Sequence, residues 1–383
     1  MTEAKKRALI VTALAGFVRS FLTHDIELLK DMGYEVHCAA NIHHPGAEGM
    51  GDYFNDLGVV FHQIDFSSNR PLSRNTLESY FRLKRLRNNV KFAVVHCHTP
   101  IAGAIARWVF RNDRKDGCKV IYTTHGFYFH KRSSKKAWII FYPIEKLMAK
   151  YCDAIITINN EDFEVAKKIK MKAAFHINGV GVNLQKYRNV KIDREDYRQK
   201  LGIASDDIVV LSVGELSSRK NQKVVVEAIG LINNPKLLFV HCGNAMNSAN
   251  TKQELLDIAK QFNVRIKLLG LRSDMPSIYQ CADIGTLSST REGLGLAGIE
   301  MLAAGLPVVA SNVHGILDYM QDGRNGYLAD PYSPQEFASG IRKMLDPVIR
   351  NAMRQFCSES VDRFDCSVSF RQMQDIYQKV LSG

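Results

Sequence analysis

Two glutamates, Glu292 and Glu300, lie with seven residues between them in a stretch that combines carboxylates with glycines. The stretch reads SSTREGLGLAGIE over residues 288–300, after an apolar run typical of a strand and at the start of a helical pattern. A carboxylate binds two vicinal hydroxyls through its two oxygens. Glycines at a helix start let backbone N–H groups approach a phosphate. The pattern predicts a site in which one carboxylate meets a sugar and the other a ribose.

Two other interpretations of the stretch stay open. Gly293, Gly295 and Gly298 form the G-x-G-x-x-G pattern of dinucleotide-binding loops. Such a loop usually follows the first strand of its domain and precedes, by about 20 residues, an acidic residue at a strand end. Neither condition is met here, which disfavours that reading. In the plainest interpretation, Glu292 is an acid that acts like an N-cap of the helix and Glu300 is a solvated helix residue.

Two adjacent cations, Arg219 and Lys220, stand where a second helix begins. They belong to the stretch SVGELSSRKN, residues 212–221, in which Gly214 frees the turn after a strand. The helix dipole disfavours cations at this end, so their presence indicates an anion between them. Arg offers a planar fork and Lys a point charge, and together they would neutralise a departing diphosphate. An exposed basic turn is the plainer alternative.

Three histidines lie near strand ends in the first half of the chain. His96 and His98 alternate along a strand, so a metal-binding pair is imaginable, but the sequence offers no apparent third ligand and we expect no metal. His125 ends another strand, which is where a doubly wound sheet places functional groups.

The elements that must position these groups are short apolar strands alternating with amphipathic helices. The predicted strands of the first series are 7–13, 34–40, 59–64, 93–96, 119–124 and 154–157, with helices over 18–32, 76–88, 103–112 and 135–150. A second series of strands is predicted at 208–213, 237–242, 267–269, 284–288 and 307–311. Runs without period-2 alternation suit parallel strands covered on both faces.

This order predicts an α/β protein of two Rossmann-like, doubly wound domains that face each other across a cleft. The predicted ranges are 1–185 and 186–363, followed by a helix in 364–383 that packs back on the N-terminal domain. Lys5, Lys6 and Arg7 precede an apolar run much as in a signal peptide, but Arg19 follows at once and no cleavage site is apparent, so we expect a first strand.

The net charge of +12 is confined to one half of the 383-residue chain. Residues 1–188 hold 29 Lys and Arg against 17 Asp and Glu, whereas residues 189–383 hold 22 of each. The basic aromatic stretch 127–136 could contact anionic lipid, or it could be a solvated face. No nucleic-acid-binding signature accompanies the charge, so we expect no nucleic-acid partner. No run reaches the roughly 18 apolar residues of a membrane span, and the eight cysteines lack disulfide or zinc spacing, which suits a reducing cytosol.

These motifs together resemble the retaining GT-B glycosyltransferases of family 4. The likeness rests on residues 214–221, on Glu292 and Glu300, and on the run AAGLPVVA at 303–310, with Asp283, Gly315 and the DGRNG turn at 322–326. The first half is similar to bacterial capsule and exopolysaccharide transferases through HCHTP (96–100), YTTHGF (122–127), YPIEK (142–146) and INNED (158–162).

The resemblance implies roles for residues at matching positions. It makes His125, Glu292, Arg219 and Lys220 catalytic. The implied donor-binding residues are Gly16, Gly214, Arg219, Lys220, Gly243, Arg272, Glu292, Gly293, Leu294, Gly295, Leu296 and Glu300. It also implies an N-terminal acceptor-binding domain, a C-terminal domain for the nucleotide sugar, and no metal or other cofactor.

The function that this resemblance implies is transfer of a hexose or N-acetylhexosamine from a UDP-sugar, with retention, to a polyprenyl-diphosphate-linked saccharide in bacterial surface glycan synthesis. The protein would then work in the cytoplasm, peripherally on the inner face of the cell membrane. A nucleotide-sugar epimerase on the same fold, a GDP-sugar-dependent transferase and a non-catalytic binding module remain alternatives.

Overall fold

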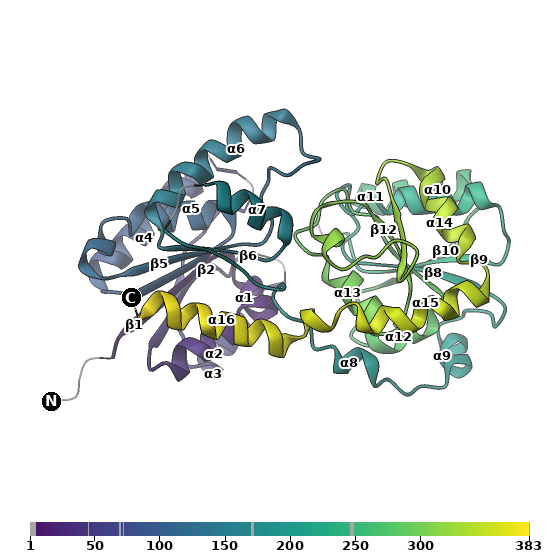
Figure 1. Ribbon diagram of the computed structural model, residues 1–383, viewed down its shortest axis with the longest axis horizontal. Coiled ribbons are helices and arrows are strands. Elements are labelled where there is room, and N and C mark those ends of the chain that lie inside the picture. Colours follow the sequence, from purple (N-terminus) through teal and green to yellow (C-terminus); the bar gives the residue numbers. More distant parts are fainter. Residues whose placement is uncertain are drawn as a thin grey trace. The chain divides into compact units, whose positions relative to one another are not determined.

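The computed structural model describes residues 5–44, 46–68, 70–71, 73–169, 172–245 and 249–382. The chain divides into two compact units, residues 1–180 with 367–383 and residues 181–366. These boundaries lie within about five residues of the predicted ones, which gave the ranges 1–185, 186–363 and 364–383. Each unit is built around its own parallel sheet (Figure 1).

The N-terminal unit contains a seven-stranded sheet in the order β3-β2-β1-β4-β5-β6-β7. Its strands are β1 (Arg7–Leu14), β2 (Glu35–Asn41), β3 (Val60–Gln63), β4 (Val94–His98), β5 (Lys119–Thr124), β6 (Ala154–Thr157) and β7 (Ala174–His176). Neighbouring strands are parallel and Ile10 of β1 pairs in register with Cys38 of β2 and His96 of β4. This order is the doubly wound one, in which residues after β1 and β4 meet at one edge.

Helices cover both faces of this sheet. They are α1 (Ala15–Phe21), α2 (Thr23–Asp31), α3 (Met50–Asp56), α4 (Arg74–Asn89), α5 (Pro100–Val109), α6 (Lys135–Met148), α7 (Asn160–Lys168) and α16 (Cys366–Leu381). Figure 1 shows α1, α2, α3 and α16 on one face and α4 to α7 on the other. The C-terminal helix α16 therefore completes the layer begun by the first helices of the chain.

The C-terminal unit has a six-stranded parallel sheet in the order β10-β9-β8-β11-β12-β13. Its strands are β8 (Ile208–Val213), β9 (Leu237–Cys242), β10 (Arg265–Gly270), β11 (Ile284–Leu287), β12 (Val308–Ser311) and β13 (Gly326–Ala329). Its helices are α8 (Gln185–Arg188), α9 (Arg194–Lys200), α10 (Gln222–Ile232), α11 (Ala249–Gln261), α12 (Met275–Cys281), α13 (Leu296–Ala303), α14 (Pro334–Lys343) and α15 (Pro347–Glu359). Buried side chains such as Val210, Phe239 and Ile284, which pair across neighbouring strands and so share one face of the sheet, form a core cluster of this unit.

The prediction of two Rossmann-like sheets is confirmed, with three local corrections. The helix predicted over 18–32 is two helices, because buried Leu22 leaves the helical conformation at φ −121° and ψ 6°. The edge strands β7 and β13 were not among the predicted strands. The polar stretch after the first unit contains the short helices α8 and α9.

The eight cysteines are distributed over both units. All eight thiols are free, seven of them are buried, and Cys366 is half-buried. They fill space in the two cores, as buried cysteines commonly do.

Candidate functional site

Most of the predicted donor residues of the C-terminal unit gather at one edge of its sheet. Because β10, β9, β8 and β11 are parallel neighbours, the loops that follow them emerge together at the carboxyl ends of the strands. These loops carry Arg272 after β10, Gly243 after β9, Arg219 and Lys220 after β8, and Glu292 after β11. Residues far apart in sequence are thus brought to a single edge.

At this edge, the buried carboxylate of Glu292 is paired with the two cations Lys220 and Arg219. Lys220 Nζ lies 2.5 Å from Glu292 Oε1, and Arg219 Nη1 lies 3.4 Å from the same oxygen. Ser289 Oγ also donates a hydrogen bond to that oxygen over 2.6 Å. Burial raises the pKa of Glu292, but the charges of Lys220 and Arg219 outweigh burial, so the pKa lies below its ordinary value. The carboxylate is therefore ionised at neutral pH.

The two cations differ in solvent exposure. The Lys220 side chain is 15% exposed, whereas the Arg219 side chain is 40% exposed. Arg219 Nη1 also donates to the carbonyl oxygen of Arg291 over 3.3 Å. A guanidinium has five N–H donors, so this geometry leaves Arg219 able to bind an added anion while it stays bonded to the loop.

Two glycines let the loops after β8 and β9 approach closely. Gly243 has φ +140°, and a Cβ built on it would lie 1.8 Å from the carbonyl oxygen of Gly214. Gly214 has φ +130° and lies against the aliphatic part of Lys220. Only glycine fits at residue 243, because any side chain would overlap backbone.

The glycine-rich loop is held in place by contacts with Tyr319 and Gly315 of the following loop. Gly295, with φ +80°, is the N-cap of α13, and its carbonyl oxygen accepts a hydrogen bond from Tyr319 Oη over 3.0 Å. A Cβ on Gly315 would lie 2.0 Å from the carbonyl oxygen of Gly293, so the next loop packs directly on this one. Leu294 is buried, and Leu296 is the first residue of α13. Since Gly295 is the N-cap, the interpretation of Glu292 as a capping acid is wrong.

Glu300 lies in a second, separate polar group. Tyr279 Oη donates to its Oε2 over 2.6 Å, and Tyr187 also hydrogen-bonds to it. Burial raises the pKa of Glu300, and these two hydroxyls lower it in part. The interpretation as a solvated helix residue is wrong. In addition, the two tyrosines were not among the predicted site residues.

Arg272 is engaged within its own loop. Its Nε donates to Asp274 Oδ1 over 2.8 Å and its Nη2 to Oδ2 over 2.5 Å, which makes a bidentate pair. Tyr197 Oη donates to the same carboxylate. The predicted donor role of Arg272 would require a phosphate to share the guanidinium with Asp274.

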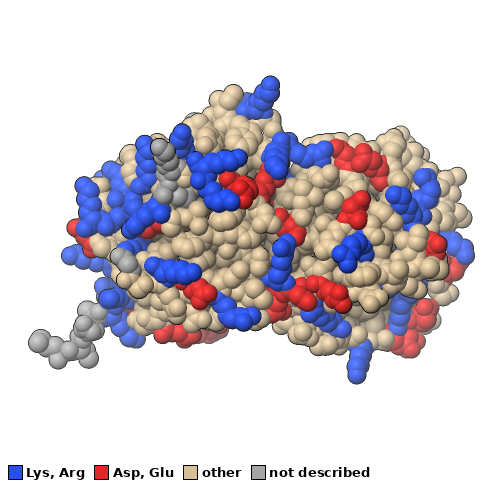
Figure 2. Space-filling view, viewed as in Figure 1, with Lys and Arg blue, Asp and Glu red and all other residues tan. Residues whose placement is uncertain are grey.

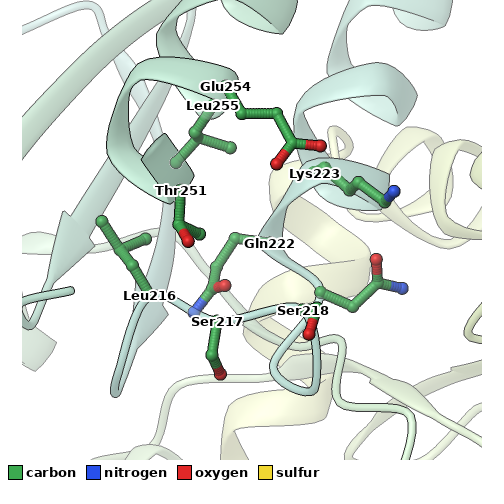
Figure 3. Close-up of a pocket in the computed structure, with 9 residues that line it drawn as sticks. Leu216, Ser217, Ser218, Gln222, Lys223, Thr251, Glu254 and Leu255 are labelled. Atoms are coloured by element: carbon green, nitrogen blue, oxygen red, sulfur yellow. The ribbon is translucent and has the colours of Figure 1, made fainter. Parts of the chain in front are cut away.

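A small pocket of about 110 Å³ lies beside the β8–α10 loop, between α10 and α11 (Figure 3). Ser217, Gln222 and Thr251 contribute polar atoms to it, and Gln222 Nε2 donates to the carbonyl oxygen of Glu215 over 2.8 Å. Arg219, Lys220 and Glu292 do not line this pocket. It is smaller than ordinary ligand pockets of about 300–1,000 Å³, which argues against its being the donor site.

In the N-terminal unit, the predicted catalytic His125 follows β5 directly. Its Nε2 lies 3.2 Å from Nδ1 of His98, and its ring packs edge-on against Phe17 at 4.8 Å between centroids. Burial lowers the pKa of His125 to about 4, so the imidazole is neutral at pH 7. Gly16 is the second residue of α1, where a Cβ would lie 3.1 Å from the carbonyl oxygen of Gly46.

The expectation that His96 and His98 have no third partner is wrong. Asp25 of α2 lies with them, and one possible ligand atom from each falls within 4.8 Å of the others. However, both ring nitrogens of His96 are hydrogen-bonded, Nδ1 to Tyr377 Oη and Nε2 to Thr123 Oγ1, each over 2.7 Å. A metal bound through either nitrogen of His96 would have to displace the hydroxyl that now bonds to that nitrogen. Asp25 was missed because it lies 71 residues before His96 on another element.

Two doubly wound parallel sheets in one chain are the architecture of the GT-B glycosyltransferases. Residues 21–186 match the family model for Glycosyltransferase Family 4, and residues 193–357 match that for glycosyl transferases group 1. A Bacillus subtilis (strain 168) protein named as glycosyltransferase EpsD is 32% identical over 97% of this chain and 96% of its own length. The chain therefore belongs to the family 4 glycosyltransferases and is an enzyme of that class.

Other comparisons agree on the fold. The Escherichia coli UDP-Gal:alpha-D-GlcNAc-diphosphoundecaprenol alpha-1,3-galactosyltransferase is 27% identical over 96% of this chain and 95% of its own. The crystal structure of Anabaena Alr3699/HepE in complex with UDP superposes with a TM-score of 0.78 at 17% identity, covering 97% of this chain and 100% of that one. WaaG, a glycosyltransferase of lipopolysaccharide biosynthesis, gives 0.71 at 16% identity, covering 98% and 100%.

Across the described ranges, no helix combines the length and apolar character required to cross a membrane.

Proposed function

We propose that this enzyme is a retaining glycosyltransferase that moves a hexose or N-acetylhexosamine from a UDP-sugar to a polyprenyl-diphosphate-linked saccharide in bacterial surface glycan synthesis. The observation that carries the proposal is the cluster of Glu292, Lys220 and Arg219 at the carboxyl edge of the C-terminal sheet. The names of two relatives support the substrates. One transfers galactose from UDP-Gal to a diphosphoundecaprenol-linked sugar, and a structural neighbour was crystallised with UDP.

In the proposed reaction, the cations stabilise the departing UDP. Arg219 and Lys220 share the negative charge that develops on the diphosphate as the glycosidic bond breaks. Glu292 binds hydroxyls of the transferred sugar, together with the backbone amides of Gly293–Gly295. The diphosphate accepts the proton of the acceptor hydroxyl, which attacks the same face of the sugar. This pathway needs no protein nucleophile and no metal.

The remaining assignments complete the donor site. Glu300 binds the ribose hydroxyls, a role that suits a carboxylate already oriented by Tyr279. His125, neutral at pH 7, contacts the transferred sugar, and Gly16 contacts the phosphates or the acceptor. The enzyme works peripherally on the inner face of the cell membrane, through the basic first half of the chain, and takes no nucleic-acid partner.

An NMR assay tests this proposal. The full chain is incubated with each of a panel of UDP- and GDP-sugars and a lipid-linked acceptor, and the anomeric protons are followed. Transfer from a UDP-sugar with the donor's anomeric configuration retained is the expected result. Inversion, a C2 epimer without transfer, transfer only from GDP-sugars, or binding without turnover would each contradict it.

A further inference from the structure

The N-terminal unit contains an apolar cavity of about 350 Å³ that none of the predicted roles uses. It lies between α5, α6 and the segment that follows β5. Its walls come mainly from aliphatic and aromatic side chains such as Ile101, Ile105, Phe129, Ile140, Phe141 and Ile144. Its volume lies in the range of ligand pockets, about 300–1,000 Å³.

The charged group at this cavity is already neutralised. Glu145 Oε2 accepts a hydrogen bond from Arg107 Nη1 over 2.8 Å, and the Arg107 guanidinium stacks 3.9 Å from the centre of the Tyr122 ring. Both members of this ion pair are buried. A sugar ring placed here would leave hydroxyls facing aliphatic walls, which is costly. The cavity therefore suits an apolar chain.

The apolar lining continues onto the outer surface of α6. Ile140 and Ile144 line the cavity and are nevertheless 41% and 45% exposed. On the same helix Ile139 is 74% and Leu147 44% exposed. Contiguous exposed apolar side chains of this size mark a docking surface for a membrane or another apolar partner.

Cations surround this apolar surface. Residues 131–150 hold six Lys or Arg against the single, already paired Glu145. The neighbouring α4 holds five Lys or Arg against Glu78 and exposes Leu77 and Phe81 by 59% and 57%. Figure 2 shows Lys and Arg side chains gathered where Figure 1 labels α4 and α5. Basic residues beside apolar ones favour an anionic head group attached to an apolar chain.

We infer that the cavity binds the isoprenoid chain of the lipid-diphosphate acceptor and that the exposed face of α6 contacts the lipid surface from which this chain comes. The inference rests on the proposed function for the identity of the acceptor. Gly126 and Phe127 line the cavity directly after His125, so a chain held here carries its diphosphate toward the end of β5. The basic residues before α6 then face the diphosphate.

Binding of farnesyl diphosphate to the full chain, measured by calorimetry, tests the cavity. Ala104 lines it, and Ala104→Phe fills part of its volume. We expect farnesyl diphosphate to bind about tenfold more weakly to A104F, the effect of excluding roughly two methylenes from an apolar site. Inorganic diphosphate should bind weakly and equally to both proteins. Absence of farnesyl diphosphate binding to the unaltered chain, or equal binding to A104F, would overturn the inference.

A second pair of variants tests the outer face without disturbing the core. Ile139→Asp should weaken binding to vesicles of phosphatidylglycerol and phosphatidylcholine about tenfold, because the charge costs about 1 kcal/mol or more near an anionic surface. Val348→Asp is the matched control, since Val348 is 73% exposed in the C-terminal unit. Equal losses in both variants, or none in I139D, would show that α6 does not contact the lipid.

Transfer assays separate this inference from the proposed function. With acceptors of short and long isoprenoid chains, A104F should reduce transfer to the longer chain more than transfer to the shorter one, so that the preference for the longer chain is lost. If neither acceptor is glycosylated but farnesyl diphosphate binding still depends on residue 104, the proposed function fails and the cavity assignment stands. If transfer proceeds with unchanged chain preference in A104F, the cavity assignment fails and the proposed function stands.

Discussion

Replacement of Lys220 by Met tests the electrostatic argument at the centre of the site. The change removes the nearest cation from the buried Glu292 carboxylate, which keeps only 9% of its side-chain exposure. Removing one partner of a buried ion pair costs about 3–5 kcal/mol. Arg219 remains at 3.4 Å and Lys220 itself is 15% exposed. We therefore expect the free energy of unfolding to fall by about 3 kcal/mol at pH 7, the lower end of that range.

The stability loss in K220M should also depend on pH in a defined direction. In the unaltered chain the pKa of Glu292 is lowered, so its contribution to stability is present above the ordinary pKa and is lost as the pH falls through the folded-state value. In K220M, burial dominates and raises the pKa, so acidification protonates the carboxylate and relieves the penalty. The difference in stability between the two proteins should therefore narrow from about pH 7 to about pH 5.

Urea unfolding can assign the loss to the correct unit. Both tryptophans, Trp108 and Trp138, lie in the N-terminal unit, so their fluorescence reports that unit alone. Circular dichroism reports both. The K220M loss should appear in circular dichroism with the fluorescence transition unchanged, and the exposed Lys223→Met should leave both unchanged.

Two results would refute the reasoning. One is a loss below about 0.5 kcal/mol, the size of an ordinary surface substitution. The other is a difference between K220M and the unaltered chain that does not change with pH. As a further check, the K220M/E292Q double variant should recover much of the stability, because it leaves no unpaired buried charge. Both variants should still lose most of their transferase turnover.

Three further predictions concern other parts of the chain. Gly243→Ala should lower the free energy of unfolding by more than about 2 kcal/mol, because its Cβ would lie 1.8 Å from the Gly214 carbonyl oxygen. Gly305→Ala is the control, because a Cβ there meets open space and should cost only about 1 kcal/mol. Thermal melts compare the two variants, and equal losses of stability would contradict the packing argument. Burial raises the pKa of Asp25 to about 7, so between about pH 4 and pH 7 the folded chain holds a proton that the unfolded chain releases. The free energy of unfolding should therefore fall as the pH rises through this range. Asp25→Asn should flatten this pH dependence in urea titrations. Binding of the full chain to anionic vesicles should weaken steeply between about 50 and 200 mM salt, and salt-independent binding in a co-sedimentation assay would argue against an electrostatic contact.

The fold was largely predictable because the strands carry a local signal. Strands buried on both faces require continuous apolar runs, and β8 and β9 begin and end at the predicted residues. Where this apolar run is short or interrupted, the sequence predicted the elements less accurately. Two of the four residues of the edge strand β13 are only half-buried, so it lacks the fully buried run of the central strands. The break at Leu22 contains no Pro or Gly that would mark it in the sequence.

The candidate site divides in the same way. Residue types and spacing singled out Arg219, Lys220, Glu292 and Glu300, because cations at a helix start and carboxylates in a glycine-rich loop conflict with purely local stability. The sequence alone did not reveal that Lys220 and Ser289 hold Glu292, whereas Tyr279 holds Glu300. Ser289 lies in the quoted loop, but a serine there has many possible partners.

What the sequence alone determined is the order of strands and helices, the class of enzyme, and the local residues that can do its chemistry. The tertiary structure decided which of those residues meet. Lys220 reaches Glu292 across 72 positions and Tyr377 reaches His96 across 281, because strand order in a parallel sheet, and not sequence distance, sets which loops and helices are neighbours. The apolar cavity beside α6 belongs to the same category, since its walls come from elements that no local pattern connects.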